Sequence, residues 1–168
     1  SDRVENIIET GFDLSIRVGV RTPDPGFIAR TLLRDQAILC AAPAYFERRE
    51  RPQNIEQLTR HDLLQFASRG ERQGWHLQEK DSTWVRAQGE VGLRLDSAEA
   101  LRATALDGLG IALLPGLLVG ADIAEGRLER VLPHLDHGEV PILALYPHKR
   151  LLEPRVRRFI DMLSEDLG

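Results

Sequence analysis

The sequence predicts an α/β fold, and three observations carry that prediction. Residues 95–115, LDSAEALRATALDGLGIALLP, place a helical pattern directly before a short apolar strand. Residues 2–18 repeat the order of helix and strand. Two apolar runs, 37–42 and 140–146, lack polar alternation, as expected of strands that are buried on both faces.

The segment 95–115 carries the clearest start and stop signals. Asp96 and Glu99 have the spacing of a capping box, so a helix is predicted to begin at Asp96. Gly108 can adopt the left-handed conformation that ends a helix. The apolar residues 111–114 then predict a buried strand that Pro115 terminates.

The N-terminal pattern is similar. Asp2 and Glu5 form a second capping box, and Gly11 ends the predicted helix. Residues 12–18 alternate apolar and polar side chains, which predicts a strand followed by a Pro-Asp-Pro-Gly turn at 23–26.

The remaining elements follow in order. Residues 28–42 predict one or two strands closed by Pro43, and short helices are predicted within 44–50 and 54–61. Four β-rich runs between 63 and 95 predict antiparallel strands inserted into the α/β scaffold. Next come a helix near 117–125 ending at Gly126, strands at 127–132 and 140–146, and a last helix that Pro154 opens.

Composition excludes several classes of function. The net charge of -4 gives no overall field that attracts nucleic acid. Cys40 is the only cysteine; it lies in an apolar run, so we expect a buried hydrophobe, no intrachain disulfide and a reducing cytoplasm. No membrane-length apolar run or signal-peptide pattern occurs.

The sequence matches cofactor-binding and metal-binding motifs only incompletely. Gly108-Leu109-Gly110 lacks the third glycine of a dinucleotide loop and follows a helix instead of a strand, so a helix stop is favoured. His134 and His137 lie in a loop-like stretch without further ligands, which favours surface histidines over a metal site. We therefore expect no cofactor, no metal and no catalytic residue.

Six segments in order resemble the C-terminal effector-binding domain of LysR-type transcriptional regulators. They are SDRVENIIETGFDLSIRVG, AILCAAPAYFERR, NIEQLTRHDLLQF, LDSAEALRATALDGLGIALLPGLLV, GRLERVLP and VPILALYPHKRLLEPRVRRFIDML, and together they span essentially the whole chain. The resemblance implies two lobes of the type 2 periplasmic-binding-protein fold with a small-molecule inducer in the cleft between them. Lobe one would comprise 1–36 and 147–168, lobe two 43–139, and the hinge crossovers 37–42 and 140–146.

The resemblance also implies what this stretch of sequence lacks. The winged helix-turn-helix of the family and the first strand, helix and second strand of lobe one are absent. DNA would be bound only through that missing N-terminal domain, and the full protein would be a dimer or tetramer. Asp96-Ser97 stands where relatives often carry Asn-Asp.

Mapped onto this sequence, the resemblance implies a ligand site at the ends of strands in both lobes. Arg17 would pair with a charge, Phe66 and Pro115 would form apolar walls, and Ser68, Ser97 and backbone N–H groups would donate or accept hydrogen bonds. The inducer expected at such a helix terminus is a small carboxylate. The complete predicted set is Arg17, Val18, Gly19, Phe66, Ser68, Asp96, Ser97, Pro115 and Gly116.

Three alternatives stay open from the sequence. A solute-binding protein of a transporter shares the fold, and a small enzyme could use Asp96 and Ser97 as acid or base in the same cleft. Exposed strand edges would also suit an oligomerisation module.

Overall fold

The computed structural model describes residues 13–18, 26–67, 75–78, 83–87, 89–147 and 154–167. The chain divides into two compact units, residues 1–35 with 140–168 and residues 36–139. We call them unit 1 and unit 2. The predicted helix over residues 2–11 lies outside the described residues.

The described residues of unit 1 form an antiparallel sheet and one helix. Its strands are β1 (Ser15–Val18), the first part of β2 (Phe27–Ala41) and β9 (Glu139–Pro147), with β9 hydrogen-bonded between β1 and β2. The helix α4 (Pro154–Leu167) begins at Pro154, as predicted. Its buried Ile160 packs against Leu32, Ile142 and Ala144, which form the core of this unit.

Unit 2 is built on a mixed sheet. The second part of β2 pairs antiparallel with β7 (Ile111–Pro115), and β8 (Glu129–Arg130) pairs with β2 as well. Beyond β7 lie β3 (Asp62–Phe66) and β6 (Glu90–Leu95), and β3 is parallel to both β7 and β6.

The parallel pairing of β3 with β6 corrects the antiparallel arrangement predicted for residues 63–95. Among the described residues of that stretch, only β4 (His76–Leu77) and β5 (Val85–Arg86) pair antiparallel. The connection over residues 67–89 is long enough for the crossover that parallel neighbours require. Alternation within short runs indicated strands but carried no information about which strands would pair.

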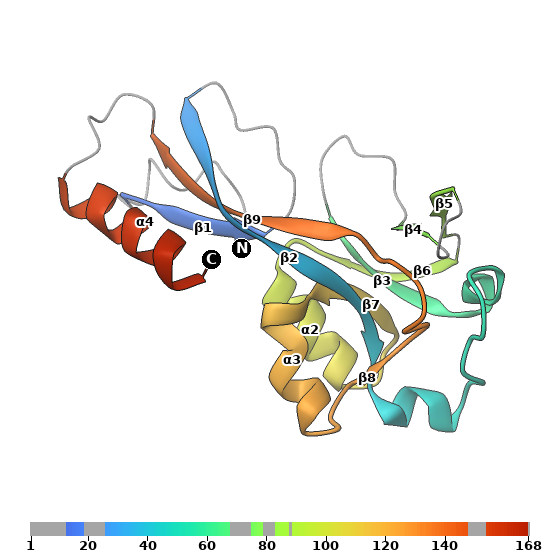
Figure 1. Cartoon of the computed structure of the whole chain (residues 1–168). Coiled ribbons are helices and arrows are strands. Elements are labelled where there is room, and N and C mark those ends of the chain that lie inside the picture. The colour runs from blue at the N-terminus through green and yellow to red at the C-terminus, as the bar shows by residue number, and fades with distance from the viewer. Residues whose placement is uncertain are drawn as a thin grey trace. The chain divides into compact units, whose positions relative to one another are not determined.

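Two helices, α2 (Ala98–Leu106) and α3 (Gly116–Ala124), cover one face of the unit 2 sheet (Figure 1). Because side chains alternate along a strand, Ile38 and Cys40 pack in the cluster beneath these helices, whereas Leu39 and Ala41 belong to a second cluster. That second cluster also contains residues of η1 (Pro43–Glu47) and η2 (Glu56–Arg60). The short helices predicted there are 3-10 helices.

Glycines fix the connection from α2 to β7. Gly108 has φ +71°, which confirms the predicted left-handed helix stop. A Cβ on Gly110 would collide with the Asp62 carbonyl oxygen, so glycine allows β7 to start close against the start of β3. The two strands therefore run side by side in the same direction and end at the same edge.

Candidate effector site

The carboxyl ends of three parallel strands meet at one edge of the unit 2 sheet, which we call the carboxyl edge. It comprises Phe66, residues 95–98 and residues 115–116. Phe66 at the end of β3 is paired with Leu95 at the end of β6, and β7 ends beside them at Pro115. Ligands of open α/β sheets bind outside such strand ends. Phe66 is 37% exposed there, so its ring is available as an apolar wall.

The helix α2 begins at this edge. Its N-cap is Ser97, whose Oγ accepts a hydrogen bond of 3.4 Å from the Ala100 backbone N–H. The capping box predicted from Asp96 and Glu99 is therefore wrong by one residue, because the third helical position is Ala100 and not Glu99. The first N–H groups of a helix have no acceptor within the helix, so those of Ala98 and Glu99 point beyond its end.

The helix α3 begins at the same edge, directly after β7. Its N-cap is Pro115 and its first residue is Gly116. The two helix amino ends thus follow β6 and β7, which flank β3 in the sheet, and each carries a partial positive charge. The predicted residues Phe66, Asp96, Ser97, Pro115 and Gly116 are brought together by unit 2.

An ion cluster fixes α2 against α3. Asp122 on α3 is fully buried, and its carboxylate accepts from Arg102 Nε on α2 at 2.5 Å and from Arg102 Nη2 at 2.8 Å. Arg127 Nη2 lies 2.8 Å from the same carboxylate. Hydrogen bonding to Arg102 holds the pKa of Asp122 below its usual range. The amino ends of α2 and α3 are therefore held in one arrangement.

The other predicted site residues fall outside this edge or outside the described residues. Arg17 and Val18 are on β1 of unit 1, where Arg17 is buried and its Nε donates to Ser15 Oγ at 3.0 Å. Gly19 and Ser68 lie outside the described residues.

Unit 2 also contains a cavity that the sequence did not predict, with a volume of about 620 Å³. It shares no residue with the predicted set. Its lining comes from four separate segments, residues 36–38, 78, 130 and 133–137. No local sequence pattern could therefore have predicted it.

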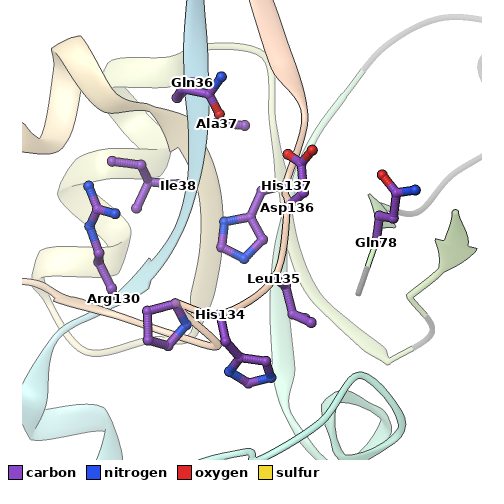
Figure 2. A pocket seen from close by; sticks show the side chains of 10 residues that line it. Gln36, Ala37, Ile38, Gln78, Arg130, His134, Leu135, Asp136 and His137 are labelled. Carbon is purple, nitrogen blue, oxygen red and sulfur yellow. The ribbon is translucent and has the colours of Figure 1, made fainter. Parts of the chain in front are cut away.

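His137 forms one wall of this cavity, beside β2 (Figure 2). Its Nδ1 accepts from the Leu39 backbone N–H at 3.3 Å, and its Nε2 lies 3.2 Å from the Leu132 carbonyl oxygen. Only the neutral ring with the proton on Nε2 satisfies both contacts. Burial lowers the pKa of His137 and favours that neutral form. Of the two predicted surface loop histidines, His134 is exposed, whereas His137 lies in a loop and is half-buried.

Burial also shifts the pKa values of Cys40 and His61. Cys40 is fully buried, and burial raises the pKa of its thiol to about 12, which confirms the predicted buried hydrophobe. The Tyr45 hydroxyl lies 3.2 Å from both His61 Nδ1 and Asp62 Oδ2 and accepts from the Asp62 backbone N–H at 3.0 Å. Burial lowers the pKa of His61.

Across the described ranges, no cluster of three or more His, Cys, Asp or Glu side chains is arranged to hold a metal ion. None of the helices in the same ranges is long and apolar enough to cross a membrane.

Comparison with known proteins gives a consistent set of relatives. The HTH-type transcriptional regulator CrgA of Neisseria meningitidis serogroup C is 32% identical over 164 residues, which cover 97% of this chain and 54% of CrgA. The HTH-type transcriptional activator TtdR of Escherichia coli K12 is 37% identical over 167 residues, which cover 97% of this chain and 52% of TtdR. This chain spans about half the length of these relatives.

Solved structures that are similar to this chain also come from transcriptional regulators. The regulatory domain of CrgA, a LysR-type transcriptional regulator, matches with a TM-score of 0.80 and 31% identity, covering 100% of this chain and 81% of that structure. Full-length AphB, a virulence activator of Vibrio cholerae, matches with a TM-score of 0.70 and 27% identity, covering 99% of this chain and 56% of AphB. The mixed α/β fold is that of the LysR regulatory domains.

A family model described as the LysR substrate binding domain matches residues 1–168. Because that match runs from end to end and the relatives exceed 30% identity over nearly all of the chain, the chain belongs to the LysR substrate-binding domain family.

Proposed function

We propose that this chain is the effector-sensing part of a LysR-type transcriptional regulator and that the carboxyl edge of unit 2 contacts a small carboxylate effector. The observation that carries the proposal is the convergence of three strand ends and two helix amino ends at that edge. Family membership supports the sensing role.

The chemistry of the edge suits an anion with an apolar body. The N–H groups of Ala98 and Glu99 donate toward the end of α2, and the helix dipoles of α2 and α3 add to their attraction for negative charge. Phe66 offers an apolar surface beside them. A carboxylate at the helix ends with its hydrocarbon part on Phe66 would satisfy both features.

The other site residues, the hinge and the control of DNA binding are proposed from the resemblance to the family. Arg17, Val18, Gly19 and Ser68 complete the site, and the crossovers 37–42 and 140–146 act as the hinge. Effector binding shifts the balance between lobe arrangements and so controls DNA binding by a helix-turn-helix domain elsewhere in a cytoplasmic, oligomeric protein. The relatives are transcriptional regulators, and this mechanism contains no chemical step.

The test is a titration of the ¹⁵N-labelled chain with small carboxylates, each matched by its neutral amide. We expect the acids, and not the amides, to shift the backbone signals of Ala98 and Glu99. Ser97→Ala should weaken binding several-fold. Ser164→Ala is the matched control, because Ser164 donates to the Ile160 carbonyl oxygen on α4 and should leave binding unchanged.

Two results would contradict the proposal. One is saturable binding of acids that leaves the signals of the carboxyl edge unmoved. The other is chemical conversion of the bound acid that Ser97→Ala abolishes, which would indicate an enzyme.

A further inference from the structure

The cavity of unit 2 is lined by residues that lie close in sequence to both ends of this unit. Residues 36–38 of β2 form one side, and residues 133–137, which lead into β9, form another (Figure 2). The boundaries of the units fall at residues 35/36 and 139/140. A molecule bound in this cavity would therefore contact unit 2 residues within three positions of each boundary.

Three side chains that carry hydrogen-bond donors line this cavity, and the described part of the chain offers no acceptor to them. Among the described residues, no carboxylate pairs with Arg130, because the neighbouring Glu129 is bound by Arg51 at 2.6 and 3.0 Å. The exposed ring of His134 carries at least one N–H in every protonation state. The Gln36 amide adds a further donor at the opposite end of the cavity (Figure 2).

The other walls are aliphatic or already hydrogen-bonded. Ile38, Pro133 and Leu135 supply hydrocarbon surface. Both ring nitrogens of His137 are engaged by backbone groups, so this ring is a fixed wall and not a donor to a ligand. The Asp136 carboxylate accepts from the Gly138 backbone N–H at 2.8 Å, and its charge disfavours a ligand with a second carboxylate near it.

We propose that this cavity is a second small-molecule site, which takes a monocarboxylate with an aliphatic body. The carboxylate pairs with Arg130 and accepts from His134, and the hydrocarbon part lies against Ile38, Pro133 and Leu135. A volume of about 620 Å³ is within the range of small-molecule sites. No residue of this site belongs to the carboxyl edge.

Binding here would bias the sensing domain through its connections. The ligand would touch β2 next to Leu39, whose N–H is held by His137, and the loop from which β9 begins. This regulatory consequence rests on the proposed sensing function, whereas the binding itself does not.

The test uses the 168-residue chain with cyclohexanecarboxylate as the probe and cyclohexanecarboxamide as its neutral match. Calorimetry measures affinity, and ¹⁵N spectra locate the site through the backbone signals of Ile38 and Leu135. We expect Arg130→Gln to weaken binding of the acid about tenfold, as loss of a charge-assisted hydrogen bond implies. Arg60→Gln removes the same charge from an exposed position outside the cavity and should change nothing.

A second variant keeps the test independent of the charge of Arg130. His134→Ala should weaken binding about threefold, and Ser97→Ala, which perturbs the carboxyl edge, should leave the Ile38 and Leu135 shifts intact. Absence of saturable binding at millimolar acid would overturn the proposal. So would equal binding of the amide, or shifts confined to Ala98 and Glu99, which would assign the acid to the carboxyl edge alone.

Discussion

Replacing His137 with leucine removes the side chain that joins β2 to the loop before β9. The Leu39 N–H loses its acceptor. The Leu132 carbonyl loses one donor and keeps the Leu135 backbone N–H, which donates to it at 3.0 Å. Leucine has no polar atom, so neither contact can be replaced by the new side chain.

The expected cost follows from the burial of Leu39. This residue is 0% exposed, so water reaches its backbone N–H poorly. An unsatisfied buried backbone group costs about 1–3 kcal/mol. We therefore expect His137→Leu to lower the free energy of unfolding by about 2 kcal/mol, which corresponds to roughly 4–8 °C in Tm for a chain of this size. His137→Gln, which keeps one acceptor and one donor, should cost less.

The same contacts make stability depend on pH. The pKa of His137 is lowered in the folded chain, chiefly by burial. The neutral ring therefore contributes its full stability above the unfolded pKa of about 6.5, and this contribution is lost as pH falls through the folded value. The loss is at most about 1.4 kcal/mol per pH unit for one proton. His61 has a lowered pKa as well and titrates in the same direction.

Urea unfolding between pH 7.5 and 5 measures both effects. Wild-type stability should decrease as the pH falls. His137→Leu should start lower and lose stability less steeply, since it removes one of the two histidines described here with a lowered pKa. If His137→Leu unfolds at the wild-type urea concentration and shows the wild-type pH slope, the bridging role assigned to His137 is refuted.

Three further predictions concern unit 2. Ser97→Ala should lower the free energy of unfolding by about 1 kcal/mol through loss of the α2 cap, measured by urea unfolding, and an unchanged midpoint would contradict Ser97 as N-cap. Asp122→Asn should cost about 3 kcal/mol, because Arg102 and Arg127 lose their buried carboxylate; a cost below about 1 kcal/mol by the same method would be inconsistent with that cluster. Cys40, fully buried with a pKa raised to about 12, should resist Ellman's reagent at pH 8 until urea is added, and rapid labelling of the native chain would contradict its burial.

Local chemistry explains why many elements of unit 2 could be predicted. Gly108 ends α2 and Pro115 ends β7 as their backbone preferences require. The predicted N-cap was Asp96 and the observed one is Ser97. Both residue types are good caps, so only the path of the chain from β6 decides between them.

Strand pairing and the cavity could not be predicted in this way. The parallel alignment of β3 with β6 depends on the route of residues 67–89 and not on the side chains of either strand. His137 resembled a loop histidine because its two partners, Leu39 and Leu132, offer backbone atoms that leave no trace in the sequence. The carboxyl edge was predictable in part, since its members follow predicted strands.

The measurement that tests the proposed function most directly is thermal denaturation of the chain with small carboxylates and their neutral amides. A ligand at one hundred times its Kd adds about 2.7 kcal/mol of stability, or roughly 5–11 °C in Tm for this size of chain. The carboxyl edge predicts that at least one acid raises Tm, that its amide does not, and that Ser97→Ala reduces the shift. Equal shifts from acid and amide, or an acid shift of the same size in Ser97→Ala, would contradict anion recognition at that edge.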